Sequence, residues 1–372
     1  MTVDLVRAAR DVADIVEAHA DAAERGRRLP MPVVDALRDA DLLRMCVPRA
    51  YGGPEADPVA MAKAIEVVSI ADGAAGWCTM IASTTSSLSA FLPPDAAMEI
   101  FGDPGNVTGG VFAPNGTGCA VEGGYRVSGV WNWGSGAQHC RYILGGTRIG
   151  DDFRLVFFDA ADVRIHDTWF TSGLRGTGSN EFSVVDAVVP AARTMSARGA
   201  KPTVDAPLAA FPNFTLLAIG VAAVALGLAR RAIDEFAELA VDKHPQFSQR
   251  TLSQVGTNQT DVARAEARLR AARAFLLGEV SDAWEVAANG GRVDLDARVR
   301  IRLAGAHAVE AATRAIESVY TMAGGAAIYD TNPLQRCLRD VHVVSQHIMV
   351  APRLFETLGK HLFGIEIDSG SI

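Results

Sequence analysis

Hydrophobic side chains in the first hundred residues recur at the spacing of an α-helix. Leu5, Val12 and Val16 fall on one helical stripe, and Val33 and Leu37 fall on another. Alanine is frequent here, and β-branched runs are short. The pattern therefore predicts helices from residue 1 to about residue 105.

Between about residues 106 and 205 the pattern changes to short runs of valine, tyrosine and phenylalanine. Glycine-rich turns separate these runs, which is typical of strands joined by tight connections. Three of the five tryptophans also fall in this stretch, where an indole can pack on the face of a sheet. The predicted strands are Tyr125–Val130, Arg141–Thr147, Arg154–Phe158 and Phe182–Val189.

From about residue 206 to the end, helical periodicity returns in four long segments. They cover 212–242, 258–289, 296–323 and 334–363, and loops with proline or glycine separate them. Four such helices predict an antiparallel bundle. The most apolar run, 216–229, is shorter than the roughly 20 residues of a membrane span and predicts a buried core helix.

The order of these patterns predicts an α+β fold with the strands segregated in the middle. We expect a helical domain over 1–105, a β domain over 106–205 and a helical bundle over 206–372. No internal repeat is evident.

Composition and charge narrow the function classes. Hydrophobic residues make up 49% and charged residues 21%, which is ordinary for a globular protein. The net charge of −8 argues against nucleic acid or an anionic membrane as the main partner. Five scattered cysteines without a CxxC pair, and a charged start MTVDLVRAAR, predict a cytoplasmic protein without disulfides.

Common catalytic motifs are missing from the chain. There is no GxGxxG after a first strand, no GxxxxGK[ST], no HExxH and no GxSxG. His342 and His347 are five residues apart, which puts them about 140° apart on a helix, so we expect no metal site.

Three stretches carry candidate chemistry. In 123–136 a tryptophan two residues before a serine can lay an indole and a hydroxyl against a planar ring, although packing on the sheet explains the same tryptophan. In 169–180 three glycines allow close backbone approach and Thr177 and Ser179 offer hydroxyls, while a tight turn is an equal alternative. In 334–347 Arg336, Asp340 and His347 share one side of a continuous helix, which is equally a solvated face.

Taken together, the stretches resemble the acyl-CoA dehydrogenase superfamily over nearly the whole chain. The resemblance rests on the three-part order and on five short motifs, which are Leu37–Leu43, Tyr51–Gly53, Trp133, Gly173–Gly176 and Gly324–Gly325 followed by Arg339–Asp340. It implies an N-terminal helical domain, a middle β-barrel and a C-terminal four-helix bundle. It also implies a homotetramer with flavin between the barrel and the bundle.

The resemblance also implies which residues meet the flavin. Phe112, Ala113 and Pro114 fall at the segment along the flavin edge, and Trp133 and Ser135 match the aromatic and hydroxyl residues beside the ring. Thr177 is a further expected cofactor contact. Phe247 lies in the loop that contacts the adenine part of the flavin in related proteins, and the pair Gly324 and Gly325 is expected near the nucleotide end of the cofactor.

One departure from the dehydrogenases concerns the catalytic base. Dehydrogenases carry a glutamate shortly after the Arg-Asp pair, whereas here no carboxylate follows Asp340 until Glu356. Abstraction of an α-proton from a thioester needs a positioned base. The segment with His347 is instead similar to flavin-dependent monooxygenases of this fold, which take reduced flavin, FMN or FAD, from a separate reductase and use O2. In that family His347 and Ser135 are the expected catalytic residues.

The substrate side of the site is expected on the helix around Trp77, Ile81 and Thr85, together with Trp169. Thr85 stands where phenol-hydroxylating members carry a histidine, and neighbouring serines and threonines predict a hydroxyl-lined pocket. We therefore expect oxidation of a small aromatic or heterocyclic substrate at carbon, nitrogen or sulfur. The alternatives are an acyl-CoA dehydrogenase with a displaced base and a paralogue that binds flavin without chemistry.

Overall fold

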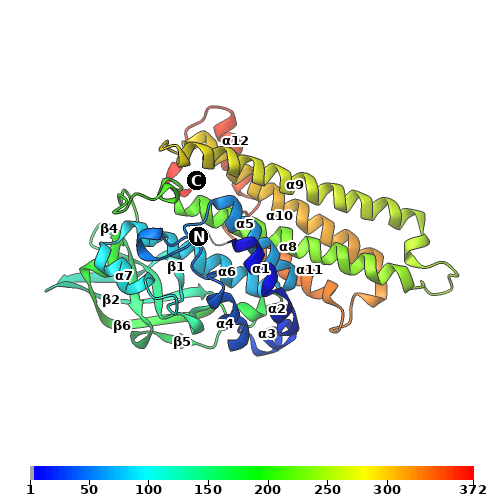
Figure 1. Ribbon diagram of the computed structural model, residues 1–372, viewed down its shortest axis with the longest axis horizontal. Helices are drawn as coiled ribbons and strands as arrows, with labels where there is room; N and C mark the ends of the chain where they lie inside the picture. Colours follow the sequence, from blue (N-terminus) through cyan, green and yellow to red (C-terminus); the bar gives the residue numbers. More distant parts are fainter. Residues whose placement is uncertain (1–3) are drawn as a thin grey trace.

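The computed structural model describes residues 4–372, so the first three residues of the predicted N-terminal domain lie outside the described residues. Figure 1 shows the sheet at one end, a long helical bundle extending from it, and the N-terminal helices packed where the two meet. The predicted order of helices, strands and helices is confirmed.

The N-terminal part is helical, as predicted. Aspartate side chains begin two of its helices by accepting backbone hydrogen bonds, Asp57 from Ala60 and Asp72 from Ala75. The helices are α1 (Leu5–Asp11), α2 (Ala13–Ala18), α3 (Ala20–Gly26), α4 (Met31–Asp39), α5 (Pro58–Ala71), α6 (Gly73–Ser86) and α7 (Pro94–Phe101).

The middle part forms one mixed sheet of seven strands in the order β5-β6-β2-β1-β3-β4-β7. Its strands are β1 (Thr108–Val121), β2 (Gly124–Gly134), β3 (Tyr142–Ile149), β4 (Asp152–Asp159), β5 (Arg164–His166), β6 (Asn180–Pro190) and β7 (Thr194–Ser196). Only β1 and β3 pair in parallel among the described ladders. Within residues 4–372 the end strands β5 and β7 do not pair, so the expected barrel is a sheet with two edges.

Trp131 is the tryptophan that packs in the sheet. Its ring stacks on Phe182 at 5.1 Å between centroids, and its Nε1 donates to the Gly146 carbonyl oxygen at 2.8 Å. Glycines leave room for it, because a Cβ at Gly116 or Gly129 would lie 2.5 or 2.6 Å from the indole. The core of this sheet thus depends on small residues around one large ring.

The bundle begins with three long helices, α8 (Asn213–Asp242), α9 (Gly256–Ala288) and α10 (Leu295–Ala323). They confirm three of the four predicted segments. By length and composition α8 is apolar enough to cross a membrane, but 89% of its most apolar window is buried inside the protein, as in a core helix.

The fourth segment is not one helix, contrary to the prediction. Helix α11 (Pro333–Val344) ends ten residues before α12 (Leu354–Leu362) begins. Ser345 donates its hydroxyl to the His342 carbonyl oxygen at 2.9 Å, and such local bonds compete with the helix. Pro352 further disfavours helix in the residue before it. His347 therefore lies in a turn, not on the stripe of Arg336 and Asp340.

Candidate active site

Two elements from different parts of the chain bring Trp77 and Ser135 together. Asp72 begins α6, which carries Trp77, and β2 ends one residue before Ser135. Both side chains are buried, and Trp77 Nε1 donates to Ser135 Oγ at 3.0 Å. The expected substrate residue and the expected catalytic hydroxyl are thus joined directly.

His347 packs on the same tryptophan. The two ring centroids are 5.4 Å apart in an edge-to-face arrangement. Burial, followed by the charge of Arg302, lowers the pKa of His347 to about 4. Met349 N donates to Nδ1 at 3.4 Å, which leaves the hydrogen of the neutral ring on Nε2. The imidazole is therefore uncharged at neutral pH.

Buried hydroxyls continue the network from Ser135. Ser135 Oγ and Ser179 Oγ are 2.7 Å apart, and Ser179 Oγ and Thr177 Oγ1 are 2.6 Å apart. Thr177 Oγ1 donates to the Leu174 carbonyl oxygen at 2.8 Å. The two hydroxyls that the sequence offers to a ligand therefore bond first to each other and to Ser135.

Asp340 anchors the end of this network. Its Oδ1 accepts from Leu174 N at 2.6 Å, and Leu174 has a left-handed φ of 48°. Burial raises the pKa of Asp340 to about 7. A Cβ on Gly173 would lie 2.3 Å from the Arg339 carbonyl oxygen, so the close approach predicted for this glycine is made to α11.

Part of β1 lies outside the strand ladders. The ladder between these strands ends at the pair Gly116–Gly129, and the pairing of β1 with β3 is interrupted between Val111 and Gly116. Residues 112–115 consequently lie in neither ladder, although buried or half-buried main-chain groups need partners. Phe112 and Ala113 have amide hydrogens that match the carbonyl oxygens on a flavin edge, whereas Pro114 has none. Two main-chain donors outside the ladders are compatible with a flavin edge, and the contact itself stays a prediction.

Trp133 does not face the buried cluster in this chain. It has a left-handed φ of 69° and 70% of its side chain is exposed. The pairing of β2 with β6 shifts between Trp131 and Gly134, which turns Trp133 outward and Ser135 inward. Its contact with a flavin ring stays a prediction.

The other expected cofactor residues lie at two places. Phe112 makes an edge-to-face contact with Phe214 of α8 at 5.6 Å, which links the sheet to the bundle. Phe247, Gly324 and Gly325 are exposed in the segments that follow α8 and α10. Figure 1 shows both segments at the end of the bundle away from the sheet. The chain does not bring these three together with Ser135.

Four hydroxyls beside the expected substrate pocket are bonded to the main chain. Ser83, Thr84, Ser86 and Ser87 donate to main-chain carbonyl oxygens at 2.7–2.8 Å. Their protons are therefore not available to a substrate. Of the remaining predicted residues, Ile81 is half-buried and Thr85 is buried on α6, and Trp169 donates its Nε1 to the Leu174 carbonyl oxygen at 3.0 Å.

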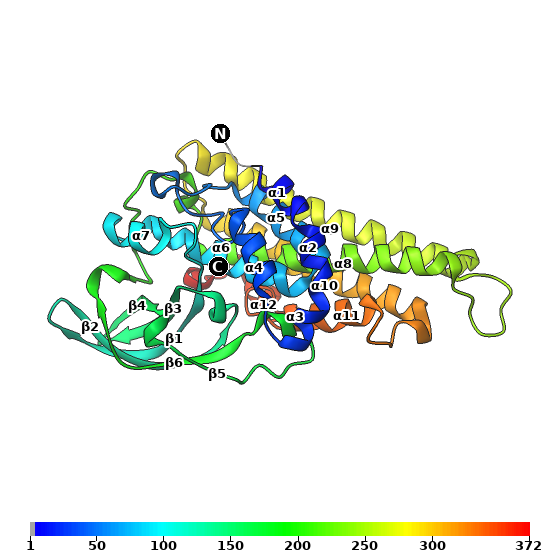
Figure 2. The same ribbon diagram turned by 60° about the horizontal axis from the view of Figure 1, so that its bottom comes forward.

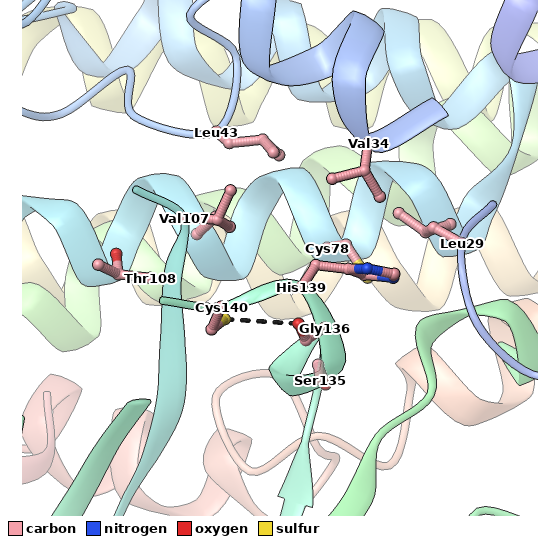
Figure 3. A pocket seen from close by; sticks show the side chains of 11 residues that line it. Leu29, Val34, Leu43, Cys78, Val107, Thr108, Ser135, Gly136, His139 and Cys140 are labelled. Carbon is pink, nitrogen blue, oxygen red and sulfur yellow. Dashed lines mark hydrogen bonds between the residues drawn. The ribbon is translucent and has the colours of Figure 1, made fainter. Parts of the chain in front are cut away.

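A small cavity adjoins Ser135 (Figure 3). It measures about 20 Å³, has mainly apolar walls from Leu29, Val34, Leu43 and Cys78, and has room for about one water molecule. The cavity is too small for an aromatic substrate. No cluster of three or more metal-binding side chains occurs within the described residues.

Two hydrogen bonds of the site cannot be predicted from the spacing of residues in the sequence. Trp77 and Ser135 lie 58 positions apart, and Leu174 and Asp340 lie 166 positions apart, so no local spacing connects them. Ser179 appears in the sequence only as a possible ligand contact. A signal for Asp340 exists, because it is the one acidic residue of α11 and lies one turn after Arg336 among apolar residues.

Comparison with known proteins assigns the fold to a family. Residues 3–92 match the model of the acyl-CoA dehydrogenase N-terminal domain, and residues 219–352 match that of the C-terminal domain. An indole-3-acetate monooxygenase of Pseudomonas putida is 35% identical, with 92% of this chain and 89% of that protein covered. The oxygenase subunit HsaA of a flavin-dependent monooxygenase of Mycobacterium tuberculosis is 30% identical, with 93% and 92% covered.

A solved structure agrees with these relatives. XiaF from Streptomyces, in complex with FADH2 and glycerol, has a TM-score of 0.90 and 26% identity, with 97% of this chain and 95% of that chain covered. The predicted α+β fold and the resemblance are thereby confirmed. The chain belongs to the acyl-CoA dehydrogenase family, in its branch of flavin-dependent monooxygenases.

Proposed function

We propose that the protein is the oxygenase component of a two-component monooxygenase that oxidises a small aromatic or heterocyclic substrate. The observation that carries the proposal is the neutral imidazole of His347 against Trp77, where a dehydrogenase would require a carboxylate base. One relative is named for an aromatic compound, indole-3-acetate, and another is named as the oxygenase subunit of a flavin-dependent monooxygenase. A separate flavin reductase is therefore the proposed partner.

The residues divide into cofactor-holding and proton-handling groups. Main-chain groups of Phe112–Pro114 would hold the flavin edge, and Trp133, Ser135 and Thr177 would lie along the ring. Reduced flavin, when bound, supplies the electrons that activate O2. His347 holds one hydrogen at Nε2 and accepts at Nδ1, so it is suited to move a proton in a buried site. Burial of Trp77, Ser135 and Thr177 excludes water from that side.

The far end of the bundle supports a proposal about assembly. Phe247, Ile328 and Tyr329 are exposed there although they are large and apolar. We propose a cytoplasmic homotetramer in which Phe247, Gly324 and Gly325 reach the nucleotide part of FAD in another copy; FMN is the alternative cofactor. Sedimentation equilibrium measures the assembly. We also propose that each subunit has three domains, with boundaries at about residues 105 and 205.

The direct test is oxygen use by the reduced protein. We expect that mixing protein and reduced flavin with O2 and an indole or phenol panel gives hydroxylated or otherwise oxygenated product with little hydrogen peroxide. His347→Ala should shift the products toward peroxide by about tenfold or more, because the proton carrier is lost. His342→Ala is the control, since His342 lies on the same segment but is exposed and pairs with Glu317.

Other outcomes distinguish the alternatives. Bleaching of oxidised flavin by acyl-CoA thioesters would favour a dehydrogenase with a displaced base. Flavin binding with neither product nor bleaching would favour a paralogue without chemistry. Unchanged coupling in His347→Ala would remove the role assigned to that residue.

A further inference from the structure

We propose that the side-chain oxygen of Asn213 is a specificity-determining acceptor, which binds the N–H or O–H group of an aromatic substrate. The proposal rests on the proposed function, because it concerns the substrate side of the same site. It adds Asn213 to the residues of the site, and it narrows the substrate class to aromatic compounds that carry a hydrogen-bond donor.

Asn213 begins α8, and its amide nitrogen binds to the end of α6. Nδ2 donates to the Thr84 carbonyl oxygen at 3.0 Å and to Ser87 Oγ at 3.0 Å. Thr84 belongs to the last turn of α6, where carbonyl oxygens have no partner within the helix. Both hydrogens of Nδ2 are therefore used within the chain.

The partners of this amide also fix which of its two atoms is the oxygen. The Thr84 carbonyl oxygen only accepts, and Ser87 Oγ uses its own hydrogen to donate to that carbonyl oxygen at 2.8 Å. Exchange of the oxygen and nitrogen of the amide would place Oδ1 against both of these acceptors. Oδ1 is therefore the atom of the amide that remains for another partner.

Oδ1 of Asn213 is buried, and no donor reaches it within residues 4–372. The hydroxyl hydrogens of Thr84 and Ser87 cannot supply one, because both already bond to main-chain oxygens. A buried acceptor without a donor destabilises a folded protein, so each such atom needs an explanation. A donor on a bound substrate supplies the missing partner.

The position of Asn213 agrees with this role. Thr84 lies seven residues after Trp77, which is two turns or about 10 Å along α6, and the two residues share one face of the helix. On the other side, Phe214 contacts the ring of Phe112 at 5.6 Å between centroids. The first turn of α8 thus contacts both the helix expected to meet the substrate and the strand expected to meet the flavin.

A buried acceptor discriminates between aromatic compounds of the same shape. An N–H or O–H group completes the hydrogen bonding of Oδ1, whereas an ether oxygen or a fluorine at that place leaves it unpaired and adds a second electronegative atom. Sites that bind a substrate N–H or O–H reject analogues without it, because the polar group of the protein then stays unpaired. Indole and naphthol carry the donor, and benzofuran and fluoronaphthalene do not.

The test compares dissociation constants within the pairs indole and benzofuran, and naphthol and fluoronaphthalene. Calorimetric titration into the protein, with and without flavin, measures them independently of turnover. In the wild type we expect the donor-bearing member to bind about tenfold or more tightly, the effect of one buried acceptor gaining its donor. Asn213→Leu has a similar size without the acceptor, so it should bring the two members of each pair within about twofold.

Thr215→Val is the matched control. It removes the Thr215 hydroxyl, which is also buried and has no partner in the part of the chain that the structure describes. Residues two positions apart do not share a helix face, so Thr215 lies on another side of α8 from Asn213. The preference for the donor-bearing compounds should therefore stay as in the wild type. Circular dichroism checks that both variants fold.

The outcomes separate this inference from the proposed function. Equal affinities within each pair in the wild type, or binding of neither member, would overturn the inference without any variant. A preference that persists in Asn213→Leu would leave that residue only a structural role at the end of α6. If the pairs bind equally but indole is oxygenated, the proposed function stands alone. A donor preference that depends on Asn213 without any oxygenation would contradict the proposed function instead.

Discussion

Asp340, which is buried, and His347, which is partly buried, are ionisable residues whose environments favour their uncharged forms. Burial raises the pKa of Asp340 to about 7 and lowers that of His347 to about 4. In unfolded chains the corresponding values are about 3.9 and about 6.5. Between about pH 4 and 6.5, the free energy of unfolding therefore changes with pH through both residues, and the two changes have opposite signs.

The sign differs between the two residues because one pKa is raised and the other is lowered. The contribution of Asp340 is complete below about pH 4 and is lost as the pH rises toward 7. The contribution of His347 is complete above about pH 6.5 and is lost as the pH falls toward 4.

Two substitutions separate these contributions. For Asp340→Asn, we compare the free energy of unfolding of the wild type with that of the variant. We expect this difference, wild type minus variant, to decrease by on the order of 2–3 kcal/mol between pH 4 and 7. The same difference for His347→Gln should increase between pH 4 and 6.5. Urea denaturation across this range measures both curves, and a difference that does not change with pH would contradict the shift assigned to that residue.

At the scale of single residues, the sequence predicts which residues belong to the site better than it predicts which side chains they contact. His347 and Ser135 stand out because a family pattern places them, and the structure puts both against Trp77. Their contact depends on how α6, β2 and the turn after α11 pack, and no spacing within the chain encodes that packing. Trp133 illustrates the limit, because one left-handed residue turns it out to solvent.

At the scale of elements, the sequence predicts helix boundaries where capping residues or prolines mark them. Asp294 begins α10 by accepting from Ala297 N at 2.8 Å, and Asn332 with Pro333 begins α11. Strand β1 was missed because its sequence TGGVFAPNGTGCAV is rich in residues that are depleted from strands. Pairing with β2 and β3 imposes the strand there.

The crossing of the 172–179 segment over α11 gives a prediction for an element contact. In Gly173→Ala the new Cβ would lie 2.3 and 2.4 Å from the carbonyl oxygen and carbon of Arg339, which are main-chain atoms of a helix. We expect a loss of about 1–3 kcal/mol of unfolding free energy, and weaker flavin binding because Leu174 moves.

A second glycine provides the control for this element. Gly325→Ala meets nothing within 4 Å, so we expect a change within about 0.5 kcal/mol. Denaturant titration of both variants measures the difference. Equal stabilities would show that the segment shifts away from α11 without cost.

At the scale of the whole molecule, all three predicted domains meet around one group of charges. Glu24 of α3 accepts from Arg339 of α11 at 2.8 Å and lies 3.7 Å from Arg175, while Arg339 also donates to the Ser172 carbonyl oxygen. Figure 2 shows α3 beside α11, between the sheet and the far end of the bundle. Glu24 thus connects the helical domain to both other domains.

This arrangement predicts that Glu24 couples the stability of the domains. Glu24→Gln leaves two arginines without their shared carboxylate, and because Glu24 and Arg339 are largely buried the cost should exceed that of an exposed pair, at about 1–2 kcal/mol. Asp35→Asn is the control, since its pair with Arg38 lies within one helix, joins no two domains, has a more exposed carboxylate, and should contribute less than about 0.5 kcal/mol. Calorimetry should show one unfolding transition in the wild type and a lower or split transition in Glu24→Gln. A transition unchanged in position and shape would mean that the domains are held together by apolar contacts alone, such as that of Phe112 with Phe214.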